Sequence, residues 1–145
     1  MKLKKILVPL RDNSNAGAEA VRLACSLARE DNAEVHLIYV IEVERSRSLD
    51  NPLHSDMEKA EGILNDGEDV ATSMGCKVVK DFCQARELGP AIVDEAGKEF
   101  DLIVMGVEYE KSLGVFDPGK TIRNIFRESQ CHVLLYRSPI TEDIS

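Results

Sequence analysis

Five short apolar segments recur along the chain, and stretches with a helical spacing of apolar residues separate them. The first, fourth and fifth segments are continuous rather than alternating, which is typical of strands that are covered on both faces. The pattern therefore predicts five strands. The segments are Ile6–Val8, Val35–Ile41, one that begins at Cys76, Leu102–Met105 and Val133–Tyr136.

Between these segments, apolar residues recur three and four positions apart, as on one face of a helix. Gly75 is a natural C-cap for the second helix, and Pro90 stands where a first helical turn tolerates proline. The alternation of strands and helices predicts a parallel α/β sheet with helices on both sides. The face-marking residues are Val21, Ala24, Cys25 and Ala28; Met57, Ala60, Ile63, Leu64, Ala71 and Met74; Ile92, Val93 and Ala96; and Ile122, Ile125 and Phe126.

Length and charge limit the classes of protein that fit this pattern. The 145 residues suit one domain that spans residues 1–145 and has one sizeable core. A formal net charge of -8 without a basic cluster argues against a nucleic-acid partner. No apolar run approaches the roughly 20 residues of a membrane helix, so no membrane insertion is expected. The longest irregular stretch, from about Glu42 to His54, is expected to be a mobile surface loop or, alternatively, a partner-binding segment.

The cysteines and histidines lack the spacing of a metal site. No Cys-x-x-Cys pair is present, which argues against a zinc or dithiol site. The apolar neighbours of the cysteines suit buried free thiols in a reducing cytosol, so a cytoplasmic location is expected. These residues are Cys25, Cys76, Cys83 and Cys131, with His36, His54 and His132 far apart from one another.

Residues Gly114–Thr121 match the phosphate-loop pattern G-x-x-x-x-G-K-[ST]. A phosphate loop follows its strand directly, whereas here the preceding strand ends near Gly106. The one strand that fits afterwards, Val133–Tyr136, carries no acidic residue to hold magnesium. An NTPase is therefore not predicted. Gly119–Thr121 still opens a helix whose N-terminus favours anions; the alternative is a glycine turn before a capped helix, with Lys120 in solvent.

An ordered set of short motifs covers nearly the whole chain: Lys4–Pro9, Asp12–Ser14, Ala20, Ala24, Leu27 and Ala28, Ala33–Leu37, Val40, Asp101–Gly106 and Cys131–Leu135. This set resembles the universal stress protein (UspA-like) family. The resemblance implies an open doubly wound sheet of five parallel strands, as in adenine nucleotide alpha-hydrolase-like proteins. It also implies a homodimer that pairs through the C-terminal strand.

The ATP-binding members of that family share a motif of Gly, two residues, Gly, nine residues, Gly, and then Ser or Thr. Gly106 matches the first glycine of this motif and Gly119 the third, with the spacing kept. Tyr109 stands at the second glycine position. Lys120 stands at the Ser/Thr position, and Thr121 follows one step later.

The resemblance also implies the residues of a nucleotide site. This placement agrees with the rule that ligands of open α/β sheets bind beyond the carboxyl ends of the strands. Just after the first strand, Asp12 is suited to accept a ribose hydroxyl; alternatively, its carboxylate is the N-cap of the first helix. Pro9, Asp12 and Val40 would line the adenine and ribose end, and Gly106, Gly119, Lys120 and Thr121 would meet the phosphates.

Two departures from the motif bear on the number of phosphates. Tyr109 removes the φ freedom by which a glycine lets the backbone approach phosphates closely. Glu108, Glu110 and Asp117 outnumber Lys111 in the same loop, and charges this close repel a triphosphate at ordinary ionic strength. The sequence therefore favours AMP or a cyclic dinucleotide over ATP, while either ATP or AMP remains a candidate ligand.

No catalytic set is apparent, because Ser14 has no histidine placed by sequence to activate it. We therefore predict a cytoplasmic, non-enzymatic regulatory or sensor homodimer of the universal stress type that binds an adenine nucleotide. The alternative is an interaction module that has lost nucleotide binding, for example a regulator of a transporter or of a stress-response partner. A third hypothesis is a small hydrolase that depends on Asp12 or Lys120.

Overall fold

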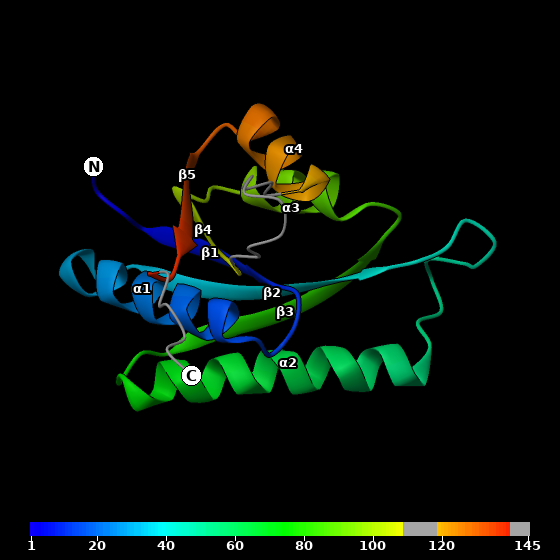
Figure 1. The fold of residues 1–145 in the computed structure, drawn as a ribbon, viewed down its shortest axis with the longest axis horizontal. Coiled ribbons are helices and arrows are strands. Elements are labelled where there is room, and N and C mark those ends of the chain that lie inside the picture. Colours follow the sequence, from blue (N-terminus) through cyan, green and yellow to red (C-terminus); the bar gives the residue numbers. More distant parts are fainter. Residues whose placement is uncertain (109–118, 140–145) are drawn as a thin grey trace, which may run out of the picture.

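Strands and helices alternate along the chain, as the apolar pattern predicts (Figure 1). The computed structural model describes residues 1–108 and 119–139. The elements are β1 (Lys5–Leu10), α1 (Asn15–Asp31), β2 (Glu34–Glu42), α2 (His54–Ser73), β3 (Val78–Ala85), α3 (Leu88–Ala96), β4 (Leu102–Val107), α4 (Lys120–Glu128) and β5 (His132–Arg137).

The strands form one parallel sheet in the order β3-β2-β1-β4-β5. The direction of winding reverses between β1 and β4, which confirms the doubly wound α/β fold and leaves β5 at an edge. β1 pairs with β2 along Lys5–Leu10, but it pairs with β4 only at Ile6 and Leu7. The two central strands therefore stop pairing well before their carboxyl ends, at the point where open α/β sheets bind ligands.

Two helical layers cover the sheet. α1 and α2 lie on one face, and α3 and α4 lie on the other (Figure 1). Successive strand side chains alternate between the two layers: in β1, Ile6 and Val8 pack with α1 and α2, whereas Leu7 packs with α3 and α4. The continuous apolar strands are thus explained by burial on both faces.

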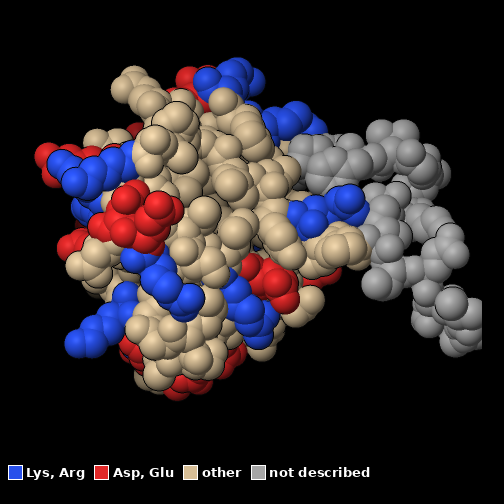
Figure 2. All heavy atoms as spheres, turned by 90° about the vertical axis from the view of Figure 1, so that its left-hand side faces the viewer, with Lys and Arg blue, Asp and Glu red and all other residues tan. Residues whose placement is uncertain are grey.

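Charges of both signs are interspersed on the side of the molecule that lies at the left of Figure 1 (Figure 2). Lys and Arg side chains alternate there with Asp and Glu side chains and with uncharged surface. This face therefore presents no continuous basic surface of the kind that nucleic-acid binders use.

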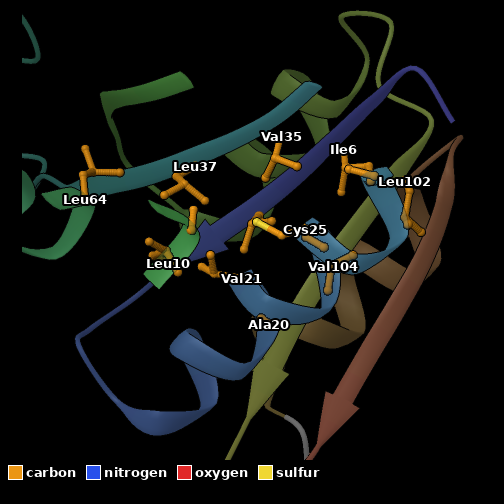
Figure 3. Packing of buried hydrophobic residues seen from close by; sticks show 14 of the residues in the cluster. Ile6, Leu10, Ala20, Val21, Cys25, Val35, Leu37, Leu64, Leu102 and Val104 are labelled. Carbon is orange, nitrogen blue, oxygen red and sulfur yellow. The ribbon is translucent and has the colours of Figure 1, made fainter. Parts of the chain in front are cut away.

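Helix α1 is held close to the sheet by small and medium side chains. Ala20, Val21 and Cys25 are at most 2% exposed. Figure 3 shows Val21 and Cys25 directed into the same apolar space as Leu37 of β2 and Val104 of β4. Burying a valine or leucine side chain in this way contributes about 1.5–3 kcal/mol. The packing fixes the position of α1 against the central strands, and with it the connection that follows β1.

Two sequence-based details are wrong. The third strand begins at Val78 rather than at Cys76, because the turn after α2 continues through Cys76: Gly75 adopts φ +70°, and Cys76 N–H donates to the carbonyl of Ala71 at 2.9 Å. Phe126 does not belong to the buried face of α4. Its side chain is 49% exposed, because the last helix buries its Ile122 and Ile125 stripe and leaves the neighbouring flank in solvent.

The connection between β2 and α2, residues 43–53, is anchored at both ends. Val43 N–H donates to the Ala85 carbonyl of β3 at 2.8 Å, and the Arg86 guanidinium donates to the carbonyls of Val43 and Glu44. Arg47 pairs with Asp56 of α2 at 3.0 Å. These contacts fix where α2 begins, and so position its first turns beside the carboxyl ends of β1 and β2.

Candidate functional site

A cavity of about 310 Å³ lies at the carboxyl ends of β1 and β2. Its apolar wall includes Leu10, Val40 and Leu88, which come from β1, β2 and α3. Cavities of this size, with an apolar wall and a few polar groups, are typical of small-molecule sites. Charged residues of both signs also line it: Arg11, Glu42, Asp56 and Lys59.

The residues predicted for the adenine end reach this edge of the sheet. Val40 is 5% exposed and forms part of the cavity wall. Pro9 precedes the wall residue Leu10 and is level with Ile38 of β2. Because the strands are parallel, their carboxyl ends meet at one edge of the sheet. The structure therefore places Pro9 and Val40 on adjacent strands near the cavity.

Asp12 lies in the connection between β1 and α1 and is not the N-cap of α1. The N-cap is Ser14, whose Oγ accepts from Gly17 N–H at 3.4 Å. Asp12 lies too early in the chain to cap the helix, and its Oδ1 instead accepts from Ser14 N–H at 3.0 Å in an Asx turn. Hydrogen bonding to Ser14, supported by the charges of Arg11 and Lys59, lowers the pKa of Asp12 although partial burial opposes this. An ionised acceptor therefore stands in the connection between β1 and α1, directly after the cavity residue Arg11.

At Gly106, β4 touches the first turn of α1. A Cβ built at Gly106 would lie 2.1 Å from the carbonyl oxygen of Ala16. The absence of a side chain is therefore required by helix packing, whether or not a ligand is bound. Glu108, two residues later, is exposed, and its carboxylate accepts from Ala16 N–H at 3.1 Å. The first turn of α1 is thus occupied by Glu108 and by Ser14.

The N-terminus of α4 is built differently. Its N-cap is Gly119, with φ +89°, and no side chain of the described residues caps the helix. Lys120 is exposed and Thr121 is half-buried in the first turn. Backbone N–H groups and the positive end of a helix dipole favour an anion at such an end, and the lysine adds a positive charge. Compared with the first turn of α1, which Ser14 and Glu108 contact, the N-terminus of α4 is therefore better suited to a phosphate.

Helix α4 is positioned through α3. A Cβ on Gly89 would lie 2.6 Å from Oδ1 of Asn124, so the two helices pack closely at this point. Gly89 follows Leu88 of the cavity wall, and Asn124 is one helical turn after Lys120. Because α4 connects the parallel strands β4 and β5, its N-terminus is directed toward their carboxyl edge.

The segment between β4 and α4 carries several residues of the predicted motif. Tyr109, Glu110, Lys111, Gly114 and Asp117 lie outside the described residues. β4 ends at Val107, well before Gly114, and in the described part of the chain a single strand follows α4. Both facts agree with the rejection of a phosphate loop.

Of the residues that line the cavity, the sequence-based site included Val40 alone; Arg11, Lys59 and Leu88 are among those that it missed. Arg11 directly follows the first strand, so the sequence alone could have placed it at the carboxyl edge of the sheet. Lys59 and Leu88 gave no such signal, because they come from α2 and α3 and reach the cavity through tertiary packing alone.

Metal ligands and membrane-spanning helices are two further features that bear on function. Within residues 1–108 and 119–139, no group of three or more His, Cys, Asp and Glu side chains is arranged to hold a metal ion. In that same part of the chain, no helix combines the length and apolar character that a membrane span requires.

Residues 2–137 match the model of the universal stress protein family. The chain is also similar to "Universal stress protein MJ0531" of Methanocaldococcus jannaschii, with 29% identity over 96% of this chain and 85% of that protein. The match to the family thus spans every strand and helix described above.

Two solved structures illustrate the likeness of fold. Universal stress protein UspA from Lactobacillus plantarum superposes with a TM-score of 0.75 and 24% identity, over 94% of this chain and 99% of that chain. The universal stress protein from Archaeoglobus fulgidus in complex with dAMP gives a TM-score of 0.71 and 16% identity, over 93% and 98% of the two chains.

Proposed function

The chain belongs to the universal stress protein family, and we propose that it is a non-enzymatic regulatory protein that binds an adenine nucleotide at the carboxyl edge of its sheet. The observation that carries this proposal is the 310 Å³ cavity with an apolar wall at the carboxyl ends of β1 and β2. Two features at the same edge of the sheet support it: the lowered pKa of Asp12, which follows the cavity residue Arg11, and the N-terminus of α4, which none of the described side chains caps. The complex of the Archaeoglobus fulgidus relative with dAMP supports it.

Each feature suits one part of a nucleotide. The base packs against Leu10, Val40 and Leu88, with Pro9 behind the wall. A ribose hydroxyl donates to the Asp12 carboxylate. The phosphate accepts from backbone N–H groups in the first turn of α4, at Lys120 and Thr121, which follow Gly119, and Gly106 lies near the carboxyl end of the preceding strand β4. The proposed binding residues are therefore Pro9, Asp12, Val40, Gly106, Gly119, Lys120 and Thr121.

The charges favour a nucleotide with few phosphates. Glu108 holds a negative charge at the first turn of α1, where it accepts from Ala16 N–H. Each further phosphate of ADP or ATP would add charge near this carboxylate, and the repulsion would be screened only over about 8–10 Å. We therefore expect AMP to bind more tightly than ATP.

We also propose that the chain forms a homodimer and works in the cytoplasm. β5 is an edge strand whose side chains Val133–Tyr136 are only half-buried, and proteins usually cover or pair such an edge. This supports a homodimer formed through β5. The four cysteines are free thiols, and Cys25 is buried, as suits a chain that works in the reducing cytoplasm.

Isothermal titration tests the proposed site. AMP is titrated into the wild type, into Asp12→Ala, and into Asp69→Ala, which makes the same charge change on an exposed position of α2. We expect saturable heat with the wild type and with Asp69→Ala. Asp12→Ala should bind at least about tenfold more weakly, because a hydrogen bond to a charged group contributes about 1.5–3 kcal/mol. Absence of heat from ATP, ADP, AMP and cyclic dinucleotides up to millimolar concentration would contradict nucleotide binding.

The second candidate function is an interaction module that binds no nucleotide. The observation that favours it is Tyr109, which replaces a glycine of the family's ATP motif. Tyr109→Gly distinguishes the two candidates. If the wild type binds no nucleotide and Tyr109→Gly alone gains tight ATP binding, the site has degenerated and this candidate is supported; AMP binding by the wild type excludes it.

A further inference from the structure

Two cysteines that are far apart in the sequence come together between α1 and α2. Cys25 of α1 is 2% exposed in the core, and Cys76, which is half-buried, packs against the same cluster. The Cys76 thiol is a neighbour that raises the pKa of Cys25. The missing Cys-x-x-Cys pair predicts no dithiol site, but the fold brings these two cysteines into one cluster.

Hydrogen bonds to the backbone at the end of α2 hold this pair of cysteines in place. Cys76 is held by the turn that ends α2, where its N–H donates to the Ala71 carbonyl at 2.9 Å and Gly75 adopts φ +70°. Arg29, one turn after Cys25, donates to the Met74 carbonyl at 3.4 Å. The second half of α1 is thus tied to the end of α2, and these connections hold Cys25 and Cys76 in the same cluster.

The other two cysteines lie across the sheet. Cys83 and Cys131 pack against the cluster formed with α3 and α4, whereas Cys25 and Cys76 belong to the cluster formed with α1 and α2. Because the sheet separates the two clusters, neither Cys83 nor Cys131 can reach Cys25 without unfolding. The fold therefore selects a single pairing.

We propose that Cys25 and Cys76 are an oxidation site, which a peroxide converts into an intramolecular disulfide. Cys76 reacts first because it is the more exposed: its sulfur bonds to one peroxide oxygen, the O–O bond breaks, and a sulfenic acid and water form. The Cys25 sulfur then attacks the Cys76 sulfur, and the hydroxyl group leaves as water with the Cys25 proton. In sum, two thiols lose two hydrogen atoms, and one hydrogen peroxide is reduced to two water molecules.

The second step is expected to depend on pH. Burial and contact with Cys76 raise the pKa of Cys25 to about 12, so its thiol is protonated at neutral pH. Since the thiolate is the nucleophile, disulfide formation should accelerate as the pH is raised from neutral toward that value. The disulfide would close a long loop that contains β2 and α2. We expect it to raise the melting temperature by about 10 °C relative to the reduced chain.

A peptide map tests the proposal. The reduced full-length chain is treated with hydrogen peroxide, the remaining thiols are alkylated after unfolding, and the chain is digested with trypsin without reduction. We expect residues 23–29 linked to residues 60–77, at a mass about 2 Da below the sum of the two thiol peptides. Residues 81–86 and 128–137, which carry Cys83 and Cys131, should be alkylated.

Cysteine variants provide the controls. Cys76→Ser, at a half-buried position, should abolish the linkage, whereas Cys83→Ser, at a position of similar exposure, should retain it. A denaturing gel without reductant confirms that the linked species has the mass of one chain. Linkage between any other pair, linkage between two chains, or oxidation of Cys76 to sulfinic acid without linkage would overturn the proposal.

Discussion

At the residue scale, Gly106 shows how packing and binding can demand the same amino acid. The family's nucleotide motif has a glycine here, and the fold needs one because the Ala16 carbonyl would lie 2.1 Å from any Cβ. The contact is with backbone of a helix that is itself buried against the core, so neither partner can move cheaply. A glycine in a ligand motif can therefore be explained by structure alone.

Gly106→Ala is expected to destabilise the chain by about 1–3 kcal/mol, the range for forced overpacking. The matched control is Gly62→Ala in α2, where nothing lies within 4 Å of the added Cβ. That change should stabilise the chain by about 0.5–1 kcal/mol, because alanine is the better helix former. Urea unfolding of both variants measures the two effects. Equal free energies of unfolding for Gly106→Ala and the wild type would refute the close approach of β4 to α1.

Asp101 gives a pH-dependent prediction. Its Oδ2 accepts from the N–H groups of Lys5 and Lys4, at 3.0 and 2.7 Å, and these bonds hold its pKa below the ordinary 3.8. A carboxyl whose pKa is lowered on folding stabilises the chain above its unfolded-state pKa and loses this contribution as the pH falls through the folded-state value. Asp101→Asn should therefore be less stable than the wild type at neutral pH.

The difference between Asp101→Asn and the wild type should shrink as the pH is lowered below 3.8, the ordinary pKa of the group. Denaturant midpoints at neutral pH and at successively lower pH values measure this convergence. Parallel curves, with the same gap at every pH, would show that the Asp101 charge contributes nothing.

At the element scale, helix ends decide which positions remain open to a ligand. The first turn of α1 is capped by Ser14 and also contacted by Glu108. The N-cap of α4 is a glycine and offers no side chain. The first turn of α1 is thus contacted by the chain's own oxygen atoms, whereas none of the described side chains caps α4.

Ser14→Ala tests the capping of α1. The loss of the Oγ that accepts from Gly17 N–H should cost about 1 kcal/mol of stability, as for other N-caps. Ser26→Ala is the control, since Ser26 is exposed within the same helix and alanine is favoured there. Thermal unfolding should separate the two variants. If both behave as the wild type, Ser14 does not cap the helix.

The elements were largely predictable, and the reasons are local. Continuous apolar runs such as Leu102–Met105 identified buried strands, and Gly75 with its positive φ marked the end of α2. The errors arose where tertiary packing decides. Phe126 continues an apolar pattern but lies on an exposed flank of α4, and Cys25 meets Cys76 through the packing of two helices.

At the scale of the whole molecule, the candidate site is assembled from elements that no local pattern connects. Asp12 and Val40 could be anticipated at one edge, because parallel strands share their carboxyl ends. Lys59 and Leu88 enter the cavity from α2 and α3, on opposite faces of the sheet. The residues that line the cavity could therefore be identified only from the three-dimensional structure.

The homodimer proposed through β5 is a prediction at the scale of the whole molecule. Light scattering should give about twice the chain mass of 16.1 kDa at micromolar concentration. Tyr136→Lys places a charge on edge strand β5 and should shift the mass toward one chain, because lysine on an edge disfavours strand pairing. A strict monomer in the wild type, or an unchanged dimer in the variant, would contradict assembly through β5.

A crystal structure of the chain grown with AMP is the most direct test of the proposed nucleotide site. We expect electron density for the base against Leu10 and Val40, for the ribose at Asp12, and for the phosphate at the first turn of α4. A fully occupied nucleotide elsewhere on the molecule would contradict it. So would an empty carboxyl edge at a millimolar concentration of AMP.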